Sequence, residues 1–207
     1  MRRIVIAAFL AASLFVSQQV IAADQAQKAQ AAESKAKVLE RNAAAGGSKQ
    51  RPSPSEIITK PETQAVDPTG NEPMDEAITC LSRAIYWETK GQDAASMEAV
   101  ANVVMNRLRQ KSFPNTICAV VKQGSERGVC QFSWWCDGRS DDAKDEKTYA
   151  IAKEIARKAL NRQLTDRTGG ALYFNNRKAS ASWSAQYIET VKIGKLFFYK
   201  PRGDAAK

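Results

Sequence analysis

Apolar residues recur at steps of three and four through much of the second half of the chain, a spacing typical of helices that face a core. One such stripe consists of Ile78, Leu81 and Ile85. Glu88 follows it, and then comes Lys90-Gly91, a pair that ends helices. Further stripes of this kind are found over residues 93–108, 114–121 and 144–161. The sequence therefore predicts a mostly helical domain.

The pattern changes after Gly169-Gly170. The runs "ALYFNN" and "GKLFFYK" are short and aromatic, which favours β-strands over helices. They predict a small sheet at the end of the domain. The predicted fold class is thus α+β, mostly helical, with a small C-terminal β-sheet.

The first residues have a different pattern, with charged Arg2 and Arg3, an apolar stretch over residues 4–16 and the small-residue sequence Ile21-Ala22-Ala23. This is the anatomy of a secretory signal peptide over residues 1–23. An uncleaved N-terminal anchor is the alternative. With cleavage, the protein is expected to be exported, to the periplasm or cell wall, without stable membrane insertion.

Residues 24–74 are rich in Ala, Gln and Lys and then in Pro, Ser and Thr, with no aromatic residue. Such a composition buries too little apolar surface to offset the entropy of ordering the chain. The interpretation is a disordered linker, whose first half could form a transient helix. It leaves one domain over residues 75–201 and a short tail over residues 202–207.

The charge of this domain indicates which class of partner it can bind. Residues 75–207 carry 22 Lys and Arg against 15 Asp and Glu, which suits a polyanionic partner or serves solubility alone. Export argues against nucleic acid as that partner.

The four cysteines indicate two disulfides with three possible pairings, because their spacing matches no common zinc pattern. They are Cys80, Cys118, Cys130 and Cys136.

The chain contains no histidine. Zinc hydrolases need imidazole ligands, and Ser or Cys hydrolases usually need an imidazole base. Acid–base chemistry near neutral pH then falls to carboxyl groups with raised pKa. Cleavage of glycosidic bonds is the reaction most naturally run by carboxylates alone, without metal or cofactor.

Glu88 is the first candidate for that chemistry. It follows Ile85 by three residues, so it continues a buried helical stripe. Partial burial beside Trp87 or Ile85 should raise its pKa, as a general acid requires. A Glu paired with a core Arg, or one at a frayed helix end, is the alternative. Asn106 and Arg107 lie off the apolar face of the next helix, which is typical of surface residues or polar support for the first helix.

The loop "CQFSWWCDG" is the second candidate. Its aromatic and polar residues suit stacking on a sugar ring and bonding to its hydroxyls, although in a small domain some of the rings are expected in the core. Asp137 fits either a second catalytic acid or a turn residue. The candidate binding residues of this loop are Gln131, Phe132, Ser133, Trp134, Trp135 and Asp137.

Together, "AIYWETKGQ", "MEAVANVVMNRL", "FPNTICAVVKQG" and "CQFSWWCDG" resemble the SleB/CwlJ-type cell wall hydrolases, the spore cortex-lytic enzyme family. The resemblance runs from about residue 77 to 199. It implies a lysozyme-like, largely helical domain that cleaves the glycan strand of peptidoglycan, often as a lytic transglycosylase, with Glu88 as the catalytic acid. It also points to substrate contacts from Tyr173 and Asn175.

Two departures from the family pattern concern the substrate. Relatives often carry His where Asn175 and Leu196 stand, and the linker shows no repeat like the peptidoglycan-binding module of some relatives. We expect a monomer that acts on peptidoglycan as a transglycosylase with one acid. A hydrolase with Asp137 as second carboxylate, a non-catalytic wall-binding module and a scaffold protein are the alternatives.

Overall fold

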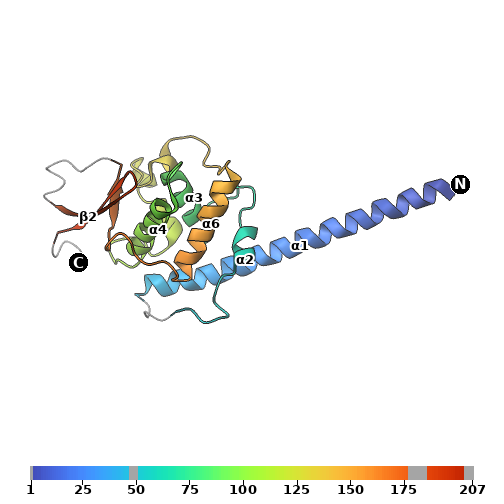
Figure 1. Cartoon of the computed structure of the whole chain (residues 1–207), viewed down its shortest axis with the longest axis horizontal. Coiled ribbons are helices and arrows are strands. Elements are labelled where there is room, and N and C mark those ends of the chain that lie inside the picture. Colours follow the sequence, from blue (N-terminus) through green and yellow to red (C-terminus); the bar gives the residue numbers. More distant parts are fainter. Residues whose placement is uncertain (1, 47–50, 177–185, 203–207) are drawn as a thin grey trace.

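The computed structural model describes residues 2–46, 51–176 and 186–202, with side chains from residue 19 onward. A long N-terminal helix extends from a compact body that holds the remaining elements (Figure 1). Among the described residues, no helix combines the length and apolar character that crossing a membrane requires. The helices are α1 (Arg2–Ala44), α2 (Lys60–Ala65), α3 (Ala77–Glu88), α4 (Ala94–Leu108), α5 (Ile117–Val121) and α6 (Glu146–Leu160), with 3₁₀ turns at Ser125–Arg127 and Ser133–Cys136.

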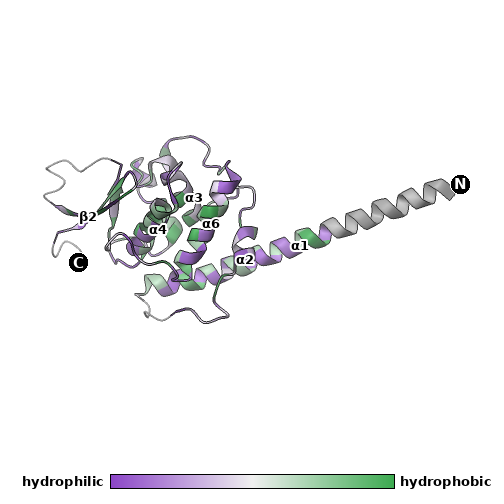
Figure 2. Ribbon diagram, viewed as in Figure 1, coloured by the Kyte–Doolittle hydropathy of each residue, from purple (hydrophilic) through white to green (hydrophobic). Residues whose placement is uncertain are grey.

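Helix α3 lies at the centre of the body, between α4 and α6 (Figure 1). The predicted stripe is buried, since Ile78, Leu81 and Ile85 are each inaccessible to solvent. Helix α6 alternates hydrophobic and hydrophilic residues along its length (Figure 2), as expected of a helix with one face on a core. Asp93 and Asp145 cap α4 and α6 by accepting hydrogen bonds from backbone N–H groups.

The predicted sheet is present and antiparallel, with the strand order β1-β3-β2. Its strands are β1 (Tyr173–Asn175), β2 (Tyr187–Ile193) and β3 (Leu196–Pro201). Phe174 lies opposite Phe198 in the ladder, and Phe198 is fully buried. The aromatic residues of both runs thus anchor the sheet to the helical core. The fold class predicted from the sequence, mostly helical α+β with a small C-terminal sheet, is confirmed.

The segment interpreted as a disordered linker differs from that expectation. Its first half belongs to α1, and side chains at steps of three and four on this helix are buried in the main core. The spacing is that of a packed helix, but most of the residues are alanines, which contribute little apolar surface each. The buried residues of this stripe are Ala32, Ala36, Leu39 and Ala43.

The second half of the segment is also ordered in the structure. Thr59 and Glu62 form a capping box at the start of α2. Glu62 accepts from Lys35 of α1 at 2.8 Å, and the backbone N–H of Ile58 donates to Asn161 Oδ1 at 3.0 Å. In the structure these residues therefore pack against the domain, which differs from the expected disordered linker.

All four cysteines form disulfides, as predicted, and the structure supplies the pairing that the sequence left open. Cys80–Cys118 joins α3 to α5. Cys130–Cys136 closes the aromatic loop on itself. The two bridges therefore restrain both candidate regions, the helix that carries Glu88 and the loop that faces it.

Candidate active site

Glu88 is the last residue of α3, where the buried stripe of the helix meets the surface. The hydroxyl of Thr89 donates to the Ile85 carbonyl at 2.6 Å and closes the helix end. Gly91, with φ of 72°, then turns the chain in a backbone region that favours glycine. These features hold the Glu88 carboxyl half-buried at a fixed helix terminus.

Burial raises the pKa of Glu88 to about 7, because the charged carboxylate is poorly solvated there. Two groups oppose that rise by stabilising the carboxylate, the indole N–H of Trp134 and the guanidinium of Arg107. Trp134 Nε1 approaches Glu88 more loosely than a full hydrogen bond requires, and it has no other partner among the described residues. A carboxyl with this pKa can both give and take a proton near neutral pH.

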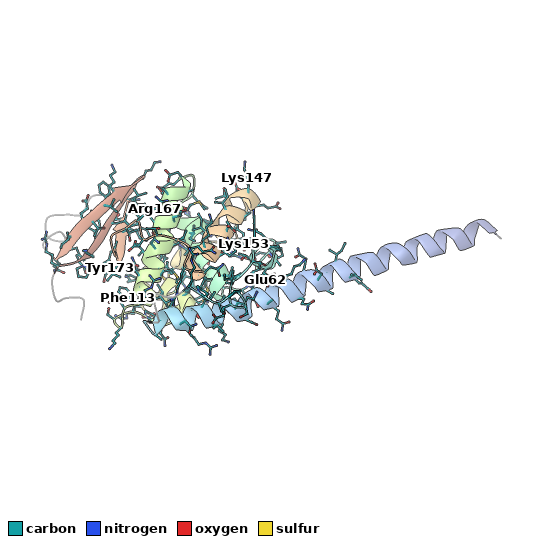
Figure 3. The ribbon with its side chains drawn as sticks, turned by 60° about the horizontal axis from the view of Figure 1, so that its bottom comes forward. Glu62, Phe113, Lys147, Lys153, Arg167 and Tyr173 are labelled. Atoms are coloured by element: carbon teal, nitrogen blue, oxygen red, sulfur yellow. A yellow bond between two sulfur atoms is a disulfide. The ribbon has the colours of Figure 1, made fainter. Side chains whose placement is uncertain are left out.

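Arg107, near the end of α4, is a functional candidate for which the sequence left open a surface position or polar support for the first helix. It is 3 % exposed, and its guanidinium lies 5.3–5.5 Å from the ring centroids of Phe113, Phe132 and Tyr173. Phe113 lies near Tyr173, the first residue of β1 (Figure 3). Burial lowers the pKa of Arg107 to about 10, which leaves it charged at neutral pH.

The hydrogen bonds of Arg107 join it to the predicted site. Nε donates to the Leu172 carbonyl at 2.7 Å, and Nη2 donates to Gln131 Oε1 at 3.3 Å. Nη1 is buried and has no hydrogen-bond partner among the described residues. The buried guanidinium of Arg107 thus contacts three of the predicted binding residues, Gln131, Phe132 and Tyr173.

The aromatic loop divides into a buried and an accessible part. Phe132 and Trp134 are 1 % and 7 % exposed, so these two rings belong to the core and offer no open face to a sugar. Trp134 stacks on Trp87, with the centroids 6.2 Å apart and the planes at 15°. Trp135 is half-buried, and Lys122 Nζ lies 4.8 Å from its centroid. The expectation that some of the rings are core residues is confirmed for Phe132 and Trp134.

The remaining polar candidates lie at the surface. Gln131, Ser133, Asp137 and Asn175 are exposed. The Asp137 carboxylate accepts the backbone N–H of Arg139 at 2.9 Å, which is the turn role that the sequence allowed. Asn175 is paired with Phe197 at the end of β1.

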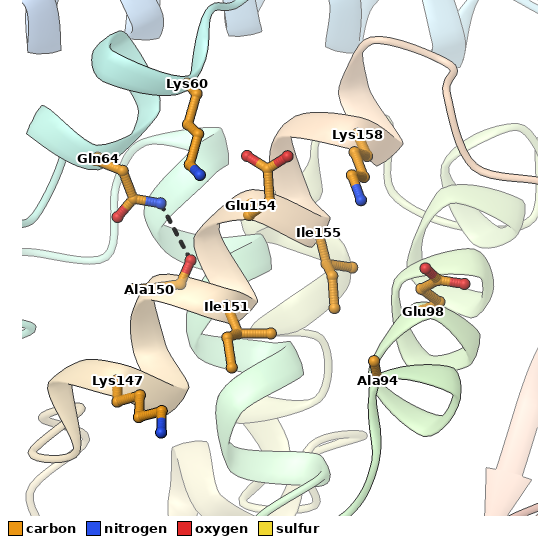
Figure 4. A pocket seen from close by; sticks show the side chains of 10 residues that line it. All are labelled: Lys60, Gln64, Ala94, Glu98, Lys147, Ala150, Ile151, Glu154, Ile155 and Lys158. Atoms are coloured by element: carbon orange, nitrogen blue, oxygen red, sulfur yellow. Dashed lines mark hydrogen bonds between the residues drawn. The ribbon is translucent and has the colours of Figure 1, made fainter.

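A separate groove of about 440 Å³ lies between α2, α4 and α6 (Figure 4). Ile151 and Ile155 line it together with lysine and glutamate side chains. It contains none of the predicted site residues, and Glu88 is not among the residues that line it.

Comparison with known proteins gives one family. A family model described as Cell Wall Hydrolase matches residues 91–199, a stretch that begins just after Glu88. A spore cortex-lytic enzyme of Bacillus cereus is 32% identical over 126 residues, which cover 59% of this chain and 44% of that protein. Another from Halalkalibacterium halodurans is 31% identical over 125 residues, covering 60% and 34%. The chain therefore spans less than half the length of these curated relatives.

Two solved structures are also similar. The catalytic domain of the Bacillus cereus SleB protein matches with a TM-score of 0.48 and 32% identity, over 60% of this chain and 89% of that one. The catalytic domain of a germination-specific lytic transglycosylase, SleB from Bacillus anthracis, matches with a TM-score of 0.49 and 32% identity, over 64% and 99%.

Proposed function

Because the chain belongs to the cell wall hydrolase family, we propose that it cleaves the glycan strand of peptidoglycan, between N-acetylmuramic acid and N-acetylglucosamine, with Glu88 as the general acid. The observation that carries this proposal is the half-buried Glu88 carboxyl with its pKa raised to about 7. An ordinary surface Glu is ionised at that pH and has no proton to give. The spore cortex-lytic names of the relatives support an activity on peptidoglycan.

The reaction proceeds in two proton transfers. Glu88 protonates the glycosidic oxygen as the bond to the muramoyl C1 breaks, and the carboxylate remains. It then takes the proton of the muramoyl C6 hydroxyl while that oxygen bonds to C1, which closes a 1,6-anhydro ring and restores the acid. Trp134 and Arg107 stabilise the carboxylate between the two steps. No water is consumed.

The charges around Glu88 support this single-acid route over hydrolysis. Among the described residues, the charged group that shifts the pKa of Glu88 is the cation Arg107, and no carboxylate does so. Asp137 acts on the pKa values of Lys90 and Asp141 instead, and its own carboxylate holds a turn. A second carboxylate at the ~5 Å of a retaining glycosidase would raise the pKa of Glu88 by repulsion.

Substrate contact is proposed for the accessible residues next to Glu88 and Arg107. The half-buried Trp135 can stack on a sugar, and Gln131, Ser133 and Asn175 carry exposed hydrogen-bonding groups. Tyr173 is partly exposed above Arg107. We further propose that residues 1–23 are a signal peptide and that the protein acts in the periplasm or cell wall as a monomer without a cofactor.

Product analysis tests the proposal directly. Purified sacculi incubated with the protein should release muropeptides whose muramoyl ends are lighter by one water than hydrolysed ends, as mass spectrometry detects. Reducing ends that incorporate ¹⁸O from labelled water would instead identify a hydrolase. Binding to sacculi without soluble products would identify a wall-binding module and contradict the enzymatic proposal.

The pH profile provides a second test of the site. Since Glu88 must start protonated, activity should fall as the pH rises through about 7. Arg107→Gln removes the cation that favours the carboxylate, so the pKa of Glu88 and the alkaline limb should both move up, by on the order of 1 pH unit. Arg107→Lys keeps the charge and should restore the limb toward its wild-type position.

Arg109→Gln is the matched control for that shift. It removes the same charge two residues further along the chain, from an exposed side chain that does not act on the pKa of Glu88. The alkaline limb of its pH–activity profile should coincide with that of the wild type. An alkaline limb that stays in place in Arg107→Gln would show that Arg107 does not tune the acid.

A further inference from the structure

Asp67 lies in the segment that the sequence assigns to the linker, outside the residues matched by the family model. Its side chain is fully buried. One carboxylate oxygen accepts from Arg83 Nη2 at 2.7 Å, from Arg83 Nε at 3.0 Å and from the Tyr149 hydroxyl at 2.6 Å. The other accepts the backbone N–H of Glu72 at 2.9 Å. Both charges of this ion pair are out of water, which costs free energy unless every donor and acceptor is matched.

A second buried cation holds the backbone that leads into Asp67. Lys153 Nζ donates to the carbonyls of Gln64 and Val66, each at 3.1 Å, and to that of Asp67 at 3.4 Å. Lys153 belongs to α6, so its ammonium joins this segment to that helix. The segment is therefore held in place by charged hydrogen bonds from α3 and α6, two helices that pack against each other.

Arg83 also donates a hydrogen bond on the side of the candidate active site. Arg83 Nη1 donates to the Asp141 carbonyl at 2.8 Å, and the indole Nε1 of Trp87 donates to that carbonyl at 3.0 Å. Arg83 and Trp87 are four residues apart on α3, so they lie on one face of the helix. One carbonyl oxygen of the loop that follows the aromatic turn thus receives two donors from the helix that carries Glu88.

Trp87 connects the Asp141 carbonyl to the surroundings of Glu88. It precedes Glu88 in the chain, and its ring stacks on Trp134, whose indole N–H stabilises the Glu88 carboxylate. A tilt of Trp87 would move Trp134 relative to the acid. The Asp141 carbonyl is the hydrogen-bond acceptor of the Trp87 indole, and Arg83 donates to the same carbonyl, so Arg83 and Trp87 share one anchor in this loop.

We propose that Asp67 is a positioning residue for the candidate active site, because its carboxylate sets the guanidinium of Arg83 that holds the Asp141 carbonyl and, through it, the Trp87–Trp134 pair beside Glu88. This inference rests on the proposed function of Glu88. It extends the catalytic unit from α3 back to a segment whose composition resembles a linker.

The test uses the full chain with Asp67→Asn, which keeps the size of the side chain and removes its charge. Arg83 then loses its counter-ion, and the rate of sacculus cleavage by folded protein should fall about 10- to 100-fold, as small misplacements of catalytic groups do. The indole N–H signal of Trp87 in the ¹⁵N–¹H spectrum, assigned with Trp87→Phe, should shift.

Tyr149→Phe is the matched control. It removes another hydrogen bond to the same Asp67 oxygen but leaves the contact of Arg83 with Asp141 intact. Both variants should lose stability, whereas the cleavage rate and the Trp87 signal should change only in Asp67→Asn. Should Asp67→Asn fail to fold, Arg83→Lys decides, since an ammonium can pair with Asp67 without reaching the Asp141 carbonyl.

A wild-type cleavage rate together with an unshifted Trp87 signal in the folded variant would overturn the proposal. The spectrum also separates the two hypotheses. If the wild-type protein does not cleave sacculi, the proposed function fails, and the Trp87 signal alone still shows whether Asp67 positions that ring.

Discussion

Glu88→Gln should lose nearly all activity on sacculi while keeping its fold. The amide has the shape and hydrogen-bonding capacity of the acid but cannot deliver a proton to the glycosidic oxygen. General acid catalysis contributes about 10²- to 10⁴-fold, and a group that serves as acid and then as base should reach the top of that range. Release of soluble muropeptides per unit time measures the loss.

Thermal unfolding of the same variant gives an independent check on the environment of Glu88. The folded-state pKa of about 7 lies above the 4.5 of an unperturbed Glu, so the folded state binds the proton more tightly. By linkage, the stability that protonated Glu88 contributes is complete below the unfolded pKa and is lost as the pH rises through about 7. The neutral amide of the variant does not titrate, so it contributes no loss of stability over this pH range.

The variant should therefore melt no earlier than the wild type at pH 5 and later at pH 8. Glu98→Gln on α4 is a suitable control, because its partner Arg167 is a surface residue. A folded Glu88→Gln protein that clears sacculi at close to the wild-type rate would remove Glu88 from the chemistry. Asp137 would then be the first carboxylate to examine.

The sequence was sufficient to predict Glu88 as a candidate because two local signals coincide there. Helical periodicity placed it on a buried stripe, and the glycine three residues later placed it at a helix end, where a carboxyl can be desolvated and still reach substrate. The fold class followed from the same periodicity and from the aromatic runs of the sheet. These predictions depend on near neighbours in the chain, and periodicity reports such neighbours well.

Arg107 and Asp67 could not be found in this way. A charged residue that departs from an apolar stripe is normally a surface residue. Each of these is buried because groups distant in the sequence surround it, Leu172 and Gln131 around Arg107 and Arg83 and Tyr149 around Asp67. No local pattern records such contacts. The Asn106-Arg107 pair at the end of an otherwise apolar helix was the one available signal.

The aromatic loop shows the same limit on a smaller scale. Its composition suits sugar binding, but composition does not tell which rings face inward. In the structure Phe132 and Trp134 alternate with the exposed Gln131 and Ser133, a pattern that a short turn closed by Cys130–Cys136 imposes. Trp135 is the ring of this loop that remains accessible for a sugar.

A chain that begins at residue 75, the domain boundary predicted from the sequence, should be strongly destabilised. It lacks the fully buried Ile58 and the alanine stripe of α1, so the core of the remaining domain is opened to water. It also lacks Asp67, which leaves Arg83 as a buried cation without its counter-ion. Loss of one partner of a buried pair costs about 3–5 kcal/mol, a large share of the ~5–15 kcal/mol by which domains are stable.

The matched control is a chain that begins at residue 24. It removes the predicted signal peptide and keeps every α1 residue that is buried among the described side chains, since residues 19–27 are exposed. We expect it to unfold cooperatively at the wild-type temperature and to cleave sacculi at the wild-type rate. The chain from residue 75 should show a broad or absent unfolding transition, loss of near-ultraviolet circular dichroism and little activity. Equal unfolding temperatures and rates for the two chains would mean that residues 24–74 are the linker that their composition suggests, because a segment that completes the core cannot be removed without cost.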